Sequence, residues 1–148
     1  MQRRVRFFSF AQMPLPSFGA MWYDPICSAE ANRVKQELGG NLGGLTNLCC
    51  VRVSHALTTA GHRIRRSSDF KDKHGNPMII RVVTMKEYLA QQFGAPSRVT
   101  LQSAAGKQGI IVFDVPFSNA TGHCDLWNGR SCAFQAYWET ATAVWLWQ

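Results

Sequence analysis

The hydrophobic pattern of the chain changes near Pro96, and this change constrains the fold more than any other feature. Before Pro96, apolar residues recur at the spacing of one helix face. After it, they form short continuous runs bounded by turn residues, which is typical of β-strands. Helices first and strands last predict an α+β fold, in which N-terminal helices pack on a C-terminal antiparallel β-sheet.

Three helices are predicted before Pro96. The first spans about residues 28–38 and ends at a glycine pair, because glycine adopts the left-handed cap conformation at little cost. The second begins near Cys49 and ends at Gly61. The third is marked by a capping-box pattern over residues 84–87 and ends at Gly94.

Strands are predicted in the remainder of the chain. Residues 110–113 form a buried strand, and residues 122–127 and 130–138 form a hairpin joined by an Asn-Gly turn. Residues 141–147 form the last strand. The residues that we expect to be mostly buried are Val53, Leu57, Leu89, Ile111, Val112, Phe113 and Leu126.

A length of 148 residues suits a single domain over residues 1–148, with residues 1–24 as an irregular leader. The leader has a basic start and a short apolar patch, but polar residues break the patch and two prolines follow it. We therefore expect no cleaved secretion signal. No apolar run approaches the ~20 residues that a membrane span needs, so no membrane partner is expected.

The net charge of +7 suits an acidic partner, either nucleic acid or the carboxylate-rich peptides of a cell wall. No motif that reads RNA or DNA is present, so no nucleic-acid partner is expected. Five cysteines, an odd number, leave at least one thiol unpaired within the chain. Because neither a Cys-x-x-Cys pair nor zinc-site spacing occurs, we expect no metal and no cofactor.

Cys49 has the setting of a catalytic thiol. It lies at a predicted helix N-terminus after Thr46 and Asn47, either of which suits the N-cap, and the unpaired N–H groups there favour a thiolate. Cys50 shares the core stripe with Val53, whereas Cys49 is rotated about 100° away. We expect Cys49 to be exposed and activated, and Cys50 to belong to the core.

His123 is the matching base. Alternation along its strand places His123 and Asp125 on one face and Cys124 on the other. A histidine on a sheet facing a cysteine at a helix N-terminus is the papain-type arrangement, in which imidazole deprotonates the thiol and later protonates the leaving amine. The other histidines are predicted to be surface residues: His55, His62 and His74.

Five stretches in order, from about Val34 to Trp147, carry a family resemblance. Residues 34–40 form a glycine-ended helix, 47–54 read N-x-C-C-x-R-x-S, and 81–89 read R-V-x-x-M-x-x-Y-L. Residues 106–113 read G-K-x-G-I-I-x-F, and 122–129 read G-H-x-D-L-W-x-G. Together these motifs resemble the fourth family of type VI secretion amidase effectors.

The resemblance implies an NlpC-type papain-like fold and hydrolysis of the γ-D-glutamyl–meso-diaminopimelate bond in the peptide stems of Gram-negative peptidoglycan. Cys49 takes the nucleophile position and His123 the base. From the same motifs we expect Asn47, Arg52 and Trp127 to bind substrate. The resemblance also implies an antibacterial toxin. It would leave the producer through a secretion apparatus without a signal peptide, act in the target cell's periplasm, and be neutralised by a cognate immunity protein.

The third catalytic residue departs from the family pattern, in which an Asp lies on the strand returning from the Trp-Asn-Gly turn. With a two-residue turn, Asp125 would pair with Cys132, and His123 would face Phe134, which cannot accept a hydrogen bond. The role of orienting the imidazole then falls to Asp125, or to Gln135 if the register slips by one residue. We favour Asp125.

Two other departures involve cysteines. Cys50 replaces the alanine that the family prefers, and Cys132 has only Cys124 as a near disulfide partner, so a bond between them stays open, as does the oligomeric state. Two further functions also stay open. One is a papain-like hydrolase acting on another amide or ester; the other is a basic binding module without catalysis, in which Cys49 is structural.

Overall fold

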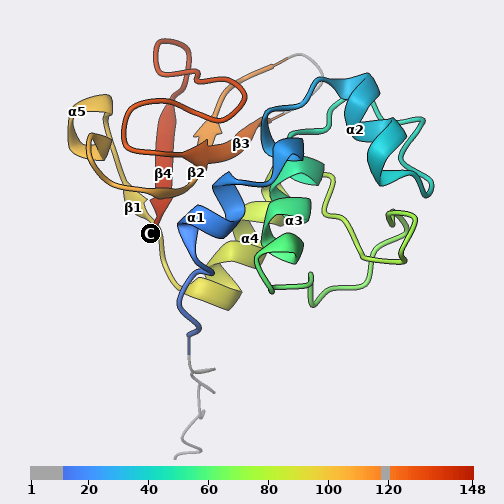
Figure 1. The fold of residues 1–148 in the computed structure, drawn as a ribbon. Helices are drawn as coiled ribbons and strands as arrows, with labels where there is room; N and C mark the ends of the chain where they lie inside the picture. Colours follow the sequence, from blue (N-terminus) through green and yellow to red (C-terminus); the bar gives the residue numbers. More distant parts are fainter. Residues whose placement is uncertain (1–11, 118–120) are drawn as a thin grey trace, which may run out of the picture.

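The computed structural model describes residues 12–117 and 121–148, which form helices packed on a four-stranded antiparallel sheet (Figure 1). The helical elements are α1 (Phe18–Trp22), the 3-10 turn η1 (Pro25–Ser28), α2 (Ala31–Leu38), α3 (Cys49–Thr59), α4 (Val82–Phe93) and α5 (Leu101–Ala104). The strands are β1 (Ser97–Arg98), β2 (Gly109–Asp114), β3 (Gly122–Trp127) and β4 (Ala143–Trp147). The predicted α+β class is confirmed.

Strand β2 occupies the interior of the sheet, whose order is β1-β4-β2-β3. It pairs along its length with β3 on one side and β4 on the other, so the buried strand predicted over residues 110–113 is confirmed. The seven residues predicted to be buried are each at most 1% exposed. A strand covered on both faces carries a continuous apolar run, which explains the Ile-Ile-Val-Phe sequence.

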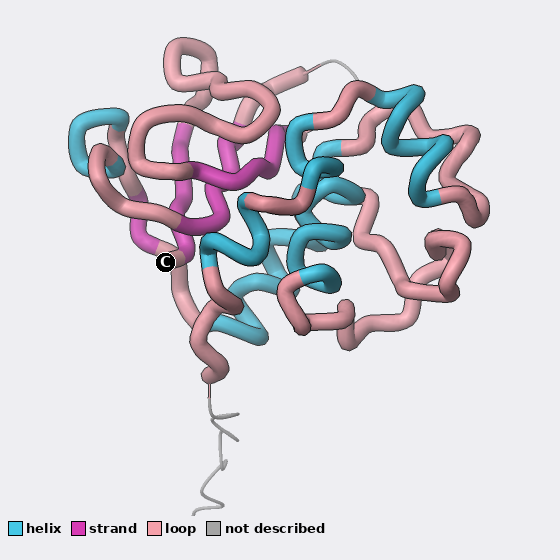
Figure 2. Tube along the Cα trace, in the orientation of Figure 1, coloured by secondary structure: helices cyan, strands magenta, loops and turns pink. Residues whose placement is uncertain are grey.

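The two faces of the sheet contribute to different cores. Ile110 and Val112 pack with residues of α1, α3 and α4, whereas Ile111 and Phe113 pack with Ala104 of α5 and with the loop after β3. In Figure 2 the main group of helices, cyan, lies to the right of the magenta strands, and α5 lies to their left. Alternate side chains of β2 therefore fasten both layers to the sheet.

The glycine stops of the first and third helices are confirmed. Gly39 caps α2 with a φ of 63°, and Gly94 caps α4 with a φ of 94°. The capping box predicted over residues 84–87 is wrong, because α4 already begins at Val82 after Arg81, which makes no side-chain cap bond. Val82 is buried in the core, so packing extends the helix beyond the local capping signal.

The strand predicted over residues 130–138 is wrong. The Asn128 side chain accepts hydrogen bonds from the backbone N–H groups of Arg130 (2.9 Å) and Ser131 (2.8 Å), and only the single bridge between Trp127 and Cys132 follows. The turn is thus longer than two residues, because a side-chain acceptor competes with the ladder for backbone donors. The predicted pairing of Asp125 with Cys132 does not form.

The leader predicted over residues 1–24 is partly corrected. Residues 1–11 lie outside the described residues, but residues 18–22 form α1, whose N-cap Ser17 accepts a hydrogen bond from the Ala20 N–H. Met21 is fully buried in the core that α1 shares with α3. None of the described helices is long and apolar enough to cross a membrane.

Replacing Gly122 with Ala tests the close approach of β2 and β3 next to the candidate base. A Cβ there would lie 2.3 Å from the Phe113 carbonyl oxygen, so the strands would have to separate locally. We expect Gly122→Ala to lower the free energy of unfolding by about 1–3 kcal/mol in a denaturant titration. Gly43→Ala, with no atom within 4 Å of the added Cβ, is the control and should change stability by less than about 0.5 kcal/mol. Equal stability of the two variants would contradict the described register.

Candidate active site

Cys49 is the first residue of α3, and its backbone is fixed from just outside the helix. Leu48 occupies the N-cap position without a side-chain bond, while the Asn47 side-chain oxygen accepts a hydrogen bond from the Cys49 N–H at 3.1 Å. The predicted helix start is therefore confirmed, whereas the predicted N-cap at Thr46 or Asn47 is wrong, because Leu48 takes that position and Asn47 holds the Cys49 N–H from one residue before it. The predicted exposure of Cys49 is wrong, since only 2% of it is accessible. The helical wheel placed Cys49 outside the core stripe of α3, but strand β3 packs against this side of the helix and covers it.

Three groups surround the Cys49 sulfur. The Cys124 Sγ lies 3.8 Å away, the Cys50 Sγ lies 3.9 Å away, and His123, which lines the same cavity as Cys49, is close enough to lower the pKa of the thiol. Hydrogen bonds from the Cys124 and Cys50 thiols, with a smaller contribution from His123, outweigh burial and hold the pKa of Cys49 below its usual value. Hydrogen bonds donated to a sulfur favour its charged form, so the surroundings favour a thiolate.

His123 lies on β3 between the thiol and a carboxylate. Its Nε2 is 2.8 Å from Asp125 Oδ2, which leaves Nδ1 for the contact with Cys49. Burial by itself lowers the pKa of His123, but the hydrogen bonds with Asp125 and Cys49 outweigh it and raise the pKa to about 9. The imidazole is therefore held protonated beside a sulfur that favours the thiolate, which is an ion pair.

Asp125 is nearly inaccessible and is fixed by backbone donors as well as by His123. It accepts hydrogen bonds from the N–H groups of Leu126 (2.7 Å), Gln135 (2.9 Å) and Phe134 (3.2 Å). Gln135, the alternative to Asp125, is exposed, and it is the Gln135 backbone N–H that contacts the carboxylate. The geometry thus favours Asp125 as the partner of the imidazole.

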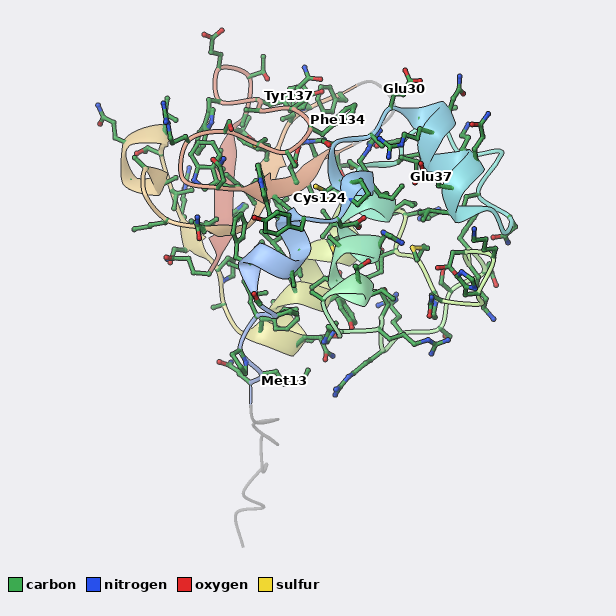
Figure 3. All side chains as sticks on the ribbon, viewed as in Figure 1. Met13, Glu30, Glu37, Cys124, Phe134 and Tyr137 are labelled. Atoms are coloured by element: carbon green, nitrogen blue, oxygen red, sulfur yellow. The ribbon has the colours of Figure 1, made fainter. Side chains whose placement is uncertain are left out.

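A cavity of ≈350 Å³ opens beside Cys49 and His123. Its other walls come from the segment before α3, from Glu30 at the start of α2, and from aromatic residues on the far side. Figure 3 labels Phe134 and Tyr137, on the loop after β3, and Glu30. The lining residues that sequence reasoning missed include Glu30 and the aromatic residues Phe117, Phe134 and Tyr137.

Of the three residues predicted to bind substrate, Asn47 and Arg52 line the cavity. Arg52 is mostly buried: its Nε donates to the Ala29 carbonyl at 2.8 Å, and its guanidinium lies 3.8 Å from the centre of the Phe134 ring. Burial lowers the pKa of Arg52 from its usual value. Trp127 is not placed to bind substrate, because it is buried in the opposite core and its indole N–H donates to the Ala104 carbonyl.

The remaining histidines do not line this cavity. His62 is buried and its Nε2 lies 2.6 Å from the Tyr88 hydroxyl, while His55 Nδ1 lies 2.5 Å from a carboxylate oxygen of Asp24. The predicted surface position is therefore wrong for His62, whereas His55 keeps 22% of its side chain accessible and His74 is exposed. His123 is the histidine beside the nucleophile candidate.

All five cysteines are free thiols, so the open question of a Cys124–Cys132 bond is answered by the structure. Cys124 faces the helices, with its sulfur 3.1 Å from that of Cys50, whereas Cys132 packs with the core on the other face of the sheet. Cys50 is buried in the core, as predicted.

Known proteins agree with the resemblance found in the sequence. The family model described as type VI secretion system (T6SS), amidase effector protein 4 (Tae4) matches residues 45–147. A chain of the Tae4–Tai4 effector–immunity complex from Salmonella Typhimurium is 31% identical with a TM-score of 0.81, and the match covers 89% of this chain and 97% of that one. The effector Tae4 from Enterobacter cloacae is 28% identical with a TM-score of 0.79, over 92% and 99% of the two chains.

No curated protein matches the chain. The family match nevertheless covers more than half of its residues, and the solved relatives share its arrangement of helices on an antiparallel sheet. The protein belongs to the Tae4 family of type VI secretion amidase effectors, which are papain-like enzymes of NlpC type.

Proposed function

We propose that the protein hydrolyses the γ-D-glutamyl–meso-diaminopimelate bond of peptidoglycan stems, with Cys49 as nucleophile, His123 as general acid and base, and Asp125 as the residue that orients His123. The observation that carries the proposal is the chain of contacts from Cys49 through His123 to Asp125, at the wall of a cavity in a member of an amidase family. Family membership supports an enzyme over a basic binding module.

The mechanism follows from the ion pair. The Cys49 thiolate attacks the carbonyl carbon of the amide, and the His123 imidazolium donates its Nδ1 proton to the departing amine, which leaves a thioester. The now neutral imidazole takes a proton from water, and the resulting hydroxide attacks the thioester. Loss of the Cys49 thiolate releases the carboxylic acid product, and the ion pair is restored. Asp125 keeps Nδ1 directed at the sulfur throughout.

Two cavity residues have the chemistry to bind the stem, which carries free carboxylates beside the scissile amide. The Arg52 Nε is engaged by the Ala29 carbonyl, and one face of the guanidinium is covered by the Phe134 ring. Its terminal N–H groups are left to bind a carboxylate. Asn47 has its side-chain oxygen engaged by the Cys49 N–H, leaving its amide nitrogen to donate to substrate. The net charge of +7 favours approach to an acidic cell wall.

The partners we propose follow from the relatives. Solved Tae4 effectors form complexes with Tai4 immunity proteins, and we propose that a cognate immunity protein protects the producer of this chain. Delivery by the secretion apparatus, without a signal peptide, would place the enzyme in the periplasm of the target cell. Neither nucleic acid nor a membrane is a proposed partner.

Digestion of purified peptidoglycan tests the bond and the nucleophile together. Mass spectrometry of the muropeptides should show stems cut between D-glutamate and meso-diaminopimelate with the wild type, and no cut stems with Cys49→Ala. Cys132→Ala is the matched control, because this thiol packs on the opposite face of the sheet, and it should retain activity. Cutting at another amide would contradict the proposed bond, and activity in Cys49→Ala would contradict the nucleophile.

Asp125→Asn tests the orienting residue. The asparagine side chain has one acceptor oxygen where the carboxylate has two, so it cannot accept hydrogen bonds from both His123 and the backbone N–H groups. We therefore expect kcat/KM to fall by as much as about 10⁴-fold. We also expect a stability loss of about 1–3 kcal/mol, because one amide N–H₂ then opposes backbone N–H groups. Gln135→Ala should retain activity, since its contact with Asp125 uses the backbone. Loss in Gln135→Ala with full activity in Asp125→Asn would reverse the assignment.

The pH dependence follows from His123, whose pKa is raised to about 9. The imidazolium that protonates the leaving amine is present below this value, so kcat/KM should fall as the pH rises through about 9. Removing the Asp125 carboxylate lowers the pKa of His123, so this fall should move to lower pH in Asp125→Asn. A profile of kcat/KM against pH for both proteins provides the measurement. If kcat/KM fell at the same alkaline pH in the wild type and in Asp125→Asn, the Asp125 carboxylate would not raise the pKa of His123.

A further inference from the structure

Three cysteine sulfurs converge behind the cavity wall. Cys124 Sγ lies 3.1 Å from Cys50 Sγ and 3.8 Å from Cys49 Sγ, and the Cys49 and Cys50 sulfurs are 3.9 Å apart. All three residues are at most 2% exposed. Within residues 12–117 and 121–148, this is the one group of three or more His, Cys, Asp or Glu side chains whose ligand atoms converge in this way.

The spacing of these sulfurs suits a shared metal ion. Zinc–sulfur bonds of about 2.3 Å in a tetrahedral arrangement place sulfurs about 3.8 Å apart. Two of the three observed separations have this length, and the Cys50–Cys124 separation would widen by about 0.7 Å to reach it. Thiolate ligands select soft cations over magnesium or calcium.

We propose that Cys49, Cys50 and Cys124 form a three-thiolate site for a thiophilic divalent cation, with zinc as the natural occupant. The expectation of no metal site considered only spacing along the sequence. Cys124 is 75 residues from Cys49, and the contact between α3 and β3 brings it there.

The charges around the cluster suit this cation. Three thiolates and one divalent cation carry a net charge of −1, and two cationic side chains are at hand: Arg52, which interacts with Cys49 and Cys124, and His123. A buried charge needs such compensation. Zinc binds cysteine as the thiolate, so any of the three sulfurs that carries a proton releases it to solvent on binding. Binding should therefore weaken as pH falls.

The consequence for activity rests on the proposed role of Cys49. A sulfur whose lone pair is donated to zinc is a poor nucleophile, so the occupied site would switch the amidase off. A chelator that removes the ion would restore activity. The metal site itself depends only on the three sulfurs, so it stands or falls independently of the catalytic proposal.

Cadmium is the spectroscopic probe for the test, because its thiolate complexes absorb in the ultraviolet. The full chain, kept reduced with a phosphine, is titrated with cadmium and analysed for bound metal. We expect one ion per chain with the absorbance of three sulfur ligands. Cys50→Ser and Cys124→Ser should each weaken binding by at least the 10–100-fold that loss of an outer-shell partner costs. Cys132→Ser, which alters a thiol outside the cluster, should bind as the wild type does.

A second measurement on the wild-type chain covers the case in which a variant fails to fold. Zinc should protect Cys49 from iodoacetamide, read by peptide mass spectrometry, and leave labelling of Cys132 unchanged. Unaltered binding in both cluster variants, equal weakening in Cys132→Ser, or no protection of Cys49 would overturn the site. The site would also be overturned if the reduced protein bound no metal and the oxidised protein formed a Cys50–Cys124 disulfide. Metal binding by a wild-type chain that cuts no peptidoglycan even after a chelator has removed the metal would instead refute the catalytic proposal alone.

Discussion

The contact between the N-terminus of α3 and the edge strand β3 is the interaction on which the site depends. It brings the Cys49 sulfur against His123 and against Cys124, which project from successive positions of one strand. The central strand β2 holds β3 in place by a continuous antiparallel ladder. Because α3 and β2 belong to the same core, the distance from Cys49 to His123 is set by the packing of the domain.

Asp125 connects His123 to the loop that shapes the cavity. Its carboxylate contacts the imidazole and also accepts hydrogen bonds from the N–H groups of Phe134 and Gln135, so the loop after β3 folds around the partner of His123. Phe134 in turn covers the guanidinium of Arg52. The carboxylate that contacts His123 thus also shapes one wall of the cavity. In the proposed mechanism, Asp125 takes the orienting role without a residue on a returning strand.

The buried thiols of Cys50 and Cys124 have two opposite effects on the reactivity of Cys49. Cys50 and Cys124 donate hydrogen bonds that favour its thiolate, and they also complete a trio of soft ligands around it. Sulfur donors that activate a nucleophile in the absence of metal would sequester it in the presence of metal. Cys50 supplies one of the three sulfurs that the proposed metal site needs.

Local patterns in the sequence determined the order of helices and strands, the buried strand at residues 110–113, the glycine ends of α2 and α4, and the start of α3 at Cys49. These features depend on short-range periodicity and capping. Tertiary structure decided the burial of Cys49, the loop in place of a strand over residues 130–138, the core position of Trp127, and the meeting of Cys50 with Cys124. Each of these depends on contacts between residues far apart in the chain or on side chains that compete for backbone donors, and neither leaves a periodic signal in the sequence.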